Sequence, residues 1–199
     1  MPHTGHRSGD GVPFELGDRA VASASQVRTA PRQSAAESAS VPLTRVDIRL
    51  ARDADVVELV PRYEWLFAPP GSRPPAWDPN AAEGRLHEVI RSDRSDAIVA
   101  DDHGSIAGFC TIYLDILSVR FGQRAWVEDL AVAPDRRSLG IGKSVLDAAK
   151  TWARERGASH LELDSALARQ DAHRFYDREG AAGRSFSFHW SLYSERPVT

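Results

Sequence analysis

The stretch from residue 126 to residue 157 constrains the fold most, because it joins a strand to a long amphipathic helix through a turn that contains glycines. Residues 126–132 predict a strand, residues 133–139 a tight turn, and Gly157 suits the end of the helix. The apolar residues of the helix recur at helical spacing and share one face: Ile141, Val145, Leu146, Ala149, Trp152 and Ala153. A helix with one apolar face, placed directly after a strand, predicts an α/β domain in which the helix covers a sheet.

Strand and helix patterns alternate along the rest of the chain from residue 45 onward. Strands are expected at residues 46–50, 97–100, 106–117 and 161–163, and helices at residues 53–60, 63–67, 80–92 and 171–179. A last strand is expected to carry Phe186, Phe188 and Trp190 on one face. The order β-α-α-β-β-β-α-β-α-β predicts an α/β fold with a mixed central sheet and helices on both faces.

The first 42 residues differ in composition from the rest of the chain. They are rich in Ser, Ala, Gly, Pro and Arg, and their few apolar residues are scattered. This composition is typical of a disordered tail, so we expect residues 1–42 to be a tail and residues 43–199 to form one domain.

Composition excludes several classes of function. The net charge is −3 and no basic block is present, so the sequence gives no case for nucleic-acid binding. No apolar run approaches the about 20 residues of a membrane-spanning helix, and no secretory leader is visible, so a cytoplasmic protein is the default expectation. A single cysteine, Cys110, excludes multi-cysteine metal sites, and the histidines lack metal-type spacing, so no metal is expected.

The glycine-containing turn is suited to binding a phosphate group. Gly140 and Gly142 allow a ligand to approach the backbone, and the first N–H groups of the helix have no partner within it. These groups point outward at the positive end of the helix dipole, and Arg136 and Arg137 add charge beside them. The nucleotide-binding P-loop pattern fails because its leading glycine would fall at Arg137, and the dinucleotide pattern fails at Val145.

Three motifs in order resemble the GNAT superfamily of N-acetyltransferases. The turn contains its Arg-x-x-Gly-x-Gly signature as Arg137-Ser-Leu-Gly140-Ile-Gly142. Upstream, Val127-Glu-Asp-Leu-Ala-Val-Ala-Pro134 resembles the fourth strand of the family. Downstream, Ala172-His-Arg-Phe-Tyr-Asp-Arg-Glu-Gly180 resembles its closing helix, and the whole resemblance covers residues 45–193.

This resemblance implies a GNAT-like sheet that splays open around acetyl-CoA as co-substrate. Carried onto this chain, the main chain of Leu130, Ala131 and Val132 would pair with the pantetheine arm. The pyrophosphate would be held by the amides of Arg137, Ser138, Leu139, Gly140, Ile141, Gly142 and Lys143. Homodimers are frequent in the family, so a homodimer is also an expectation.

The resemblance also implies two catalytic residues. Tyr176 matches the tyrosine that protonates the leaving thiolate, and Glu128 lies where several members carry the base that deprotonates the amine. Asp129 is the alternative base; because neighbouring strand residues face opposite sides, only one of the two would face the cleft unless a β-bulge resets the register. Two positions depart from the family pattern, namely Ala181 for its aromatic and Arg169 for its asparagine. We expect Arg169 to be a solvent-exposed charge.

The acceptor is expected to be a small-molecule primary amine. Aromatic and acidic residues in the first helices and central strands would suit a cationic, polyamine-like or aminoglycoside-like amine: Tyr63, Trp65, Phe67, Trp77, Asp78, Tyr113, Asp115 and Trp126. The alternatives are acetylation of a protein lysine or N-terminus, and a non-catalytic acetyl-CoA sensor.

Overall fold

A computed structural model describes residues 46–190 and residue 192 of the chain. The expected tail, residues 1–42, lies outside the described residues, so the predicted domain boundary stays a prediction. The elements in chain order are β1 (Asp47–Leu50), the 3-10 turn η1 (Asp53–Asp55), α1 (Val56–Arg62), α2 (Glu64–Phe67), α3 (Pro79–Arg91), β2 (Ser95–Asp102), β3 (Ser105–Leu114), β4 (Arg124–Val132), the 3-10 turn η2 (Pro134–Arg136), α4 (Ile141–Glu155), β5 (His160–Leu163) and α5 (Gln170–Arg178).

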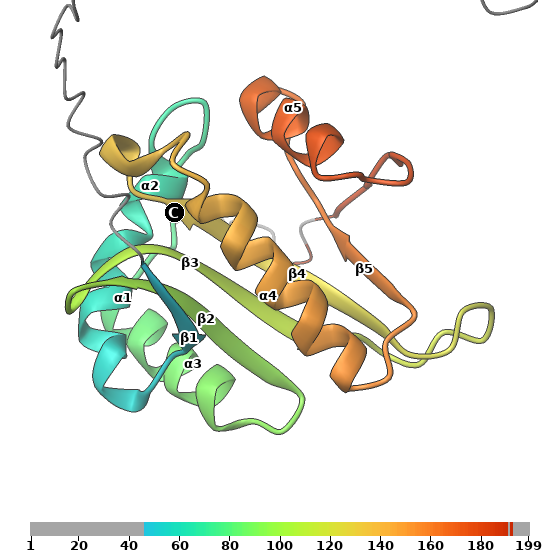
Figure 1. Cartoon of the computed structure of the whole chain (residues 1–199), viewed down its shortest axis with the longest axis horizontal. Helices are drawn as coiled ribbons and strands as arrows, with labels where there is room; N and C mark the ends of the chain where they lie inside the picture. The colour runs from blue at the N-terminus through green and yellow to red at the C-terminus, as the bar shows by residue number, and fades with distance from the viewer. Residues whose placement is uncertain (1–45, 191, 193–199) are drawn as a thin grey trace, which may run out of the picture. The chain divides into compact units, whose positions relative to one another are not determined.

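The five strands form one mixed sheet in the order β1-β2-β3-β4-β5. The first four pair antiparallel, and β5 runs parallel to β4 after the crossover through α4. The β4–β5 pairing ends at Val127, whereas β4 remains paired to β3 as far as Val132. The two strands therefore separate beyond Val127, and Figure 1 shows β5 diverging from β4. This confirms the predicted splayed, mixed sheet.

Helices cover both faces of the sheet and create two cores, which also confirms the prediction. On one face α4 buries Val145, Ala149 and Trp152 against residues of β2, β3 and β4 such as Cys110. On the other face α1 and α3 enclose Phe109, which is wholly buried with Leu59. No helix among the described residues is long and apolar enough to cross a membrane.

Two strand predictions are wrong: the end of one strand and the existence of another. The strand expected to reach residue 117 ends at Leu114, because the chain then folds into a turn closed by a bridge between Ser118 and Gly122. The last expected strand is absent: residues 181–190 have no regular secondary structure and pair with no described strand. The side chains of Phe186, Phe188 and Trp190 are exposed instead of covering a sheet.

Candidate active site

A β-bulge at Glu128 brings two carboxylates to the same cavity. In the β3–β4 ladder Thr111 pairs with Asp129 but Ile112 pairs with Val127, so Glu128 is the extra, unpaired residue. The bulge removes the strict alternation of faces, and both Glu128 and Asp129 line one cavity of about 430 Å³. The β-bulge that would allow both carboxylates to face the cleft is therefore present.

Asp129 is the deeper of the two carboxylates and is held by hydrogen bonds. Its Oδ2 accepts from the hydroxyl of Tyr63 and from the hydroxyl of Thr111, both at 2.9 Å. Burial raises its pKa, although these two donors oppose the shift. Burial and the neighbouring carboxylate likewise raise the pKa of Tyr63, so this phenol stays a donor to Asp129.

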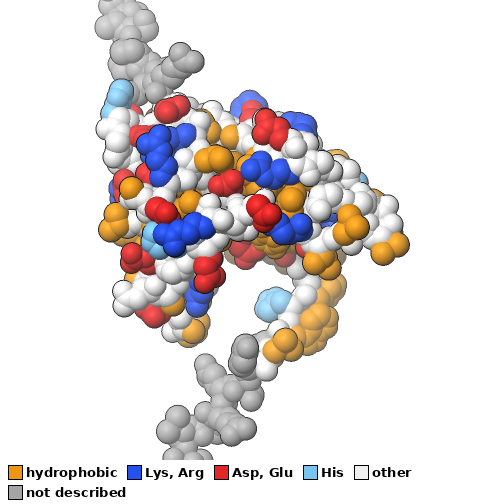
Figure 2. Space-filling model, turned by 90° about the horizontal axis from the view of Figure 1, so that it is seen from below, with side chains coloured by type: hydrophobic (Ala, Val, Ile, Leu, Met, Phe, Trp, Pro, Cys, Tyr) orange, Lys and Arg blue, Asp and Glu red, His pale blue; other side chains and the backbone are white. Residues whose placement is uncertain are grey.

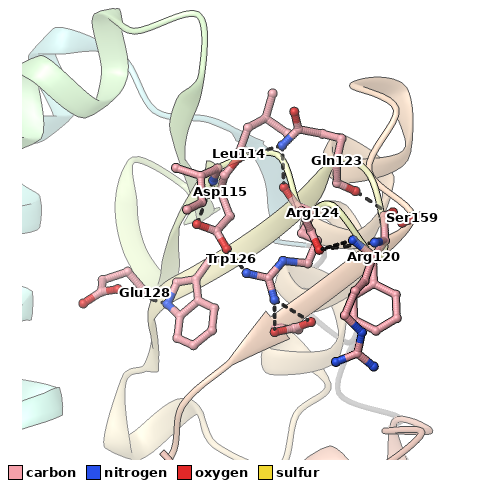
Figure 3. Close-up of polar contacts among 12 residues, drawn as sticks. Leu114, Asp115, Arg120, Gln123, Arg124, Trp126, Glu128 and Ser159 are labelled. Atoms are coloured by element: carbon pink, nitrogen blue, oxygen red, sulfur yellow. Dashed lines mark hydrogen bonds and ion pairs between the residues drawn. The ribbon is translucent and has the colours of Figure 1, made fainter. Parts of the chain in front are cut away.

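Glu128 is the more accessible carboxylate and has one oxygen engaged. Its Oε2 accepts from the indole nitrogen of Trp126 at 3.0 Å, and Figure 3 shows the two side chains together. Partial burial raises the pKa of Glu128, and the charge of Asp129 adds to this shift. A carboxylate with a raised pKa is a better proton acceptor than an ordinary one, and it remains ionised near neutral pH only while the shift is modest.

The cavity has aromatic walls, as expected, but uses only part of the expected set. Tyr63, Trp77 and Tyr113 line it. The other five expected residues do not line it. Asp78 caps α3 through the amide of Asn80, and two aromatic residues pack elsewhere, Trp65 on Phe109 and Phe67 on Trp77. Asp115 pairs with Arg124, and the indole of Trp126 donates to Glu128 (Figure 3).

Sequence reasoning missed one charged residue of the cavity wall. Arg85 lies on α3 on the same side as Ala82, Leu86 and Val89, which also line the cavity. Its guanidinium makes no ion pair with any carboxylate of the described residues. The helical spacing of these four positions was a signal that could have placed Arg85 beside the pocket.

The turn before α4 presents a row of free backbone donors. Ser138 and Gly140 have φ values of 64° and 85°, and this left-handed geometry turns the chain into the helix. The first helical bond of α4 runs from the amide of Ser144 to the carbonyl of Gly140 at 3.0 Å. Within residues 46–190, no group accepts from the amides of residues 137–143. The free N–H groups at the N-terminus of α4 and in the turn before it fit a phosphate or pyrophosphate group.

The charges around this turn differ from the expectation. Arg136 is not free, because its guanidinium pairs with Asp102 at 2.7 Å. Lys143 pairs with Asp147 and Glu179, at 2.6 and 3.2 Å. The exposed Arg137 donates weakly to the carbonyl of Val132, at 3.4 Å, and makes no ion pair with the described carboxylates.

The edge of β4 that faces β5 has no strand partner over residues 128–132. Leu130 and Val132 pack towards the α4 core, and Ala131 is buried on the opposite face. The strand β4 forms its hydrogen bonds to β3 through one edge, and its other edge is unused over these residues. Main-chain groups on this second edge are therefore open to an extended ligand that enters between β4 and β5.

Tyr176 lies on α5, which packs beside the start of α4. Its neighbour Phe175 packs on it, with ring centroids 5.2 Å apart, and approaches Gly142 at the start of α4. The hydroxyl of Tyr176 makes no hydrogen bond to any described residue. Burial raises the pKa of this phenol, while the charge of Arg169 opposes the shift, so the group is protonated at neutral pH.

Arg169 is not the solvent-exposed charge that we expected. Its Nη2 donates to the carbonyl of Leu66 at 2.7 Å, across 103 positions of the chain. This bond ties the start of α5 to the end of α2, the helix that directly follows Tyr63 of the cavity wall.

Residues 59–181 match the acetyltransferase (GNAT) family, which is more than half of the chain. An uncharacterised N-acetyltransferase of Bacillus subtilis, YhdJ, is 34% identical over 105 residues, which cover 52% of this chain and 73% of that protein. The streptothricin acetyltransferase of Streptomyces lavendulae is 38% identical over 86 residues, covering 43% of this chain and 42% of that one.

Solved structures show the same fold. The aminoglycoside N-acetyltransferase AAC(6')-Iy in complex with CoA superposes with a TM-score of 0.64, over 73% of this chain and 93% of that chain, at 16% identity. The GNAT family uses acetyl-CoA, and the free amides before α4 and the open edge of β4 fit its diphosphate and its extended arm. The chain belongs to the GNAT family and is an N-acetyltransferase.

Proposed function

We propose that this enzyme transfers the acetyl group of acetyl-CoA directly to a primary amine of a small molecule. The observation that carries the proposal is the bulge at Glu128, which places two carboxylates in one aromatic cavity of about 430 Å³. A cavity of this size accommodates a small molecule, and its carboxylates and ring faces attract an ammonium group.

In this proposal the turn and the open strand edge bind acetyl-CoA. The amides of Arg137, Ser138, Leu139, Gly140, Ile141, Gly142 and Lys143 hold the pyrophosphate, and the main chain of Leu130, Ala131 and Val132 pairs with the pantetheine arm. The support is that these amides have no acceptor within the described residues and that β4 has no partner beyond Val127.

Glu128 is the proposed base and Tyr176 the proposed acid. An amine is protonated at neutral pH and must lose a proton before it attacks the thioester carbonyl. Glu128 accepts that proton, because it is the more accessible carboxylate and has one oxygen without a partner among the described residues. Tyr176 then donates its proton to the departing thiolate, since its hydroxyl bonds to no described residue and its raised pKa keeps the group protonated at neutral pH.

Asp129 is assigned a supporting role in this scheme. Its Oδ2 is occupied by Tyr63 and Thr111, which fixes the floor of the cavity. Its charge also raises the pKa of Glu128 and so strengthens the base.

A cationic amine of the aminoglycoside-like or polyamine-like kind is the proposed acceptor class. The streptothricin acetyltransferase, a relative by sequence, acts on a small molecule by its name, which supports this class. Within this class, the unpaired Arg85 on the cavity wall would disfavour the members with the most positive charges.

The test is release of CoA from acetyl-CoA with a panel of amines: aminoglycosides, polyamines, amino acids and a lysine-containing peptide. Steady turnover with a small amine, lost in Glu128→Gln, is the expected result. Turnover with the peptide alone would instead support a protein acetyltransferase. Binding of acetyl-CoA without turnover of any amine would support a sensor.

A further inference from the structure

The proposed base, Glu128, lies where β4 is least constrained by its neighbours. Up to Val127 the strand is paired on both edges, to β3 and to β5, and beyond Val127 no described strand pairs with its second edge. Glu128 is the first residue past this point and is also the extra residue of the bulge, so neither neighbouring strand pairs with it. A general base acts only from a set position, so a side-chain contact has to orient this carboxylate.

A single side-chain hydrogen bond holds the carboxylate of Glu128. The indole nitrogen of Trp126 donates to its Oε2 at 3.0 Å, and no other group of residues 46–190 bonds to this carboxylate. Figure 3 shows the indole nitrogen beside the carboxylate. The bond engages one oxygen and leaves Oε1 available to accept a proton.

Trp126 belongs to the most firmly held part of the strand. It pairs with Tyr113 of β3 on one edge and with Glu162 of β5 on the other. Two positions before it, Arg124 forms ion pairs with Asp115 and with Glu162, the second at 3.1 Å (Figure 3). The indole donor is therefore carried on a fixed backbone, whereas the carboxylate that it holds is on an unpaired one.

Trp126 does not line the acceptor cavity, although Glu128 does. We propose that Trp126 is a positioning residue, which holds Glu128 in the orientation that accepts the proton of the attacking amine. In that step an N–H bond of the ammonium group breaks, the proton goes to Oε1, and the electron pair stays on the nitrogen for the attack. The inference rests on the proposed role of Glu128 as the base.

The charges nearest to Glu128 set the direction of the expected pH effect. Burial and the charge of Asp129 raise its pKa, and Asp164, which directly follows β5, adds to this. The indole N–H of Trp126 opposes the shift, because it stabilises the charged form of the carboxylate. Loss of the indole should therefore raise the pKa of Glu128 further.

The other elements around the cavity do not change this direction. Tyr63 and Tyr113 have pKa values raised by burial, so both phenols stay neutral. Arg85 of α3 is the one cation among the described residues that line the cavity, and no substitution below touches it. Figure 2 shows Lys and Arg side chains interspersed with Asp and Glu on one face, so more distant charges provide no strong field of one sign.

Trp126→Phe removes the donor and keeps an aromatic ring. The acid limb of kcat/KM for the amine should move to higher pH by about 0.5–1 pH unit, and kcat should fall by about 10-fold. The Kd for acetyl-CoA should stay within about twofold. Trp65→Phe is the matched control and should change none of these, since Trp65 packs on Phe109 and its indole nitrogen donates to no described residue. An unshifted limb in Trp126→Phe, or the same shift in the control, overturns the inference.

A double substitution separates positioning from a direct contact with the acceptor. If Trp126 acts only through Glu128, adding Trp126→Phe to Glu128→Gln should lower kcat/KM by less than about twofold beyond Glu128→Gln alone. A further loss of about 10-fold would show that Trp126 acts independently of the carboxylate, which overturns the inference.

NMR of the natural enzyme tests the bond without turnover. The indole N–H resonance of Trp126 is identified among the five tryptophans by its loss in Trp126→Phe. Its chemical shift should titrate with the ionisation of Glu128 and should stop titrating in Glu128→Gln. A resonance that does not respond to pH overturns the inference alone. A titrating resonance together with a fully active Glu128→Gln would instead overturn the proposed base, and the positioning role with it.

Discussion

At the residue scale, the site depends on one inserted residue in β4. Glu128 and Asp129 are adjacent in sequence and would face opposite sides of a regular strand. The bulge places both at one cavity, and their proximity raises the pKa of Glu128 beyond the effect of burial alone. Sequence reasoning identified both carboxylates and the need for a bulge, but it could not locate one, because a bulge depends on how two strands pair.

Replacing Asp129 with Asn should move the pH dependence of the reaction. A base works only when it is deprotonated, so kcat/KM should fall on the acid side through the pKa of Glu128. The charge of Asp129 raises that pKa, and its removal should lower it. We therefore expect the acid limb of the kcat/KM profile to shift to lower pH in Asp129→Asn and to vanish in Glu128→Gln. An unshifted limb would mean that Glu128 is not the group that titrates.

Replacing Tyr176 with Phe should slow the chemical step alone. The substitution removes a hydroxyl that bonds to no described residue, so little stability should be lost. If Tyr176 protonates the thiolate, kcat should fall by roughly 10²-fold, while the Kd for acetyl-CoA stays within about twofold. Steady-state kinetics with a calorimetric Kd measure both quantities, and an unchanged kcat would exclude Tyr176 from the mechanism.

At the element scale, the sequence predicted best where the periodicity was long. The helix α4 and the strand β4 appear where expected, because their apolar residues repeat over several turns or positions. Short or end segments fared worse: the strand through residue 117 stops at Leu114, and the strand around Phe188 has no partner among described residues. A strand is held by hydrogen bonds to a neighbouring strand, and the local sequence does not specify which strand that is.

The turn before α4 can be tested with a pair of glycines. Gly140 and Gly104 both have positive φ, 85° and 90°, and neither would place a Cβ within 4 Å of another group. Alanine at either position should therefore cost about 1–2 kcal/mol of the free energy of unfolding from backbone strain. Only Gly140→Ala should also weaken acetyl-CoA binding, because Gly104 lies in the β2–β3 turn. Equal binding losses at both positions would show a general effect of destabilisation.

One buried hydrogen bond fastens α4 to the sheet. The indole nitrogen of Trp152 donates to Asp96 Oδ2 at 2.9 Å, and the only other polar side chain near that oxygen among the described residues is Arg156, at 3.6 Å. Trp152→Phe keeps most of the packing but removes this donor from a buried carboxylate. It should lower the free energy of unfolding in urea by about 1–3 kcal/mol.

Trp65→Phe is the control for this bond. The indole nitrogen of Trp65 donates to no described residue, so its replacement should cost less than that of Trp152. Similar losses for the two substitutions would show that packing, and not the bond to Asp96, sets the stability at Trp152.

At the scale of the whole molecule, the two proposed ligand sites lie along the same strand of the splayed sheet. The parallel crossover through α4 puts its free amides beside the open edge of β4, and the bulge of the same strand opens onto the cavity. The glycine signature predicts the first site, the binding site for acetyl-CoA, and this stays a prediction. The second could be predicted only in part, since Arg85 and Thr111 reach the cavity through packing between elements that are distant in sequence.

The proposed chemistry depends above all on binding of the diphosphate of a CoA thioester by the amides of residues 137–143. Calorimetric titration of the intact protein with acetyl-CoA is the decisive experiment. We predict saturable binding at one site per chain, weakened in Gly140→Ala and retained in Tyr176→Phe. The absence of any heat of binding at millimolar acetyl-CoA would contradict this assignment, and with it the roles proposed for Glu128 and Tyr176.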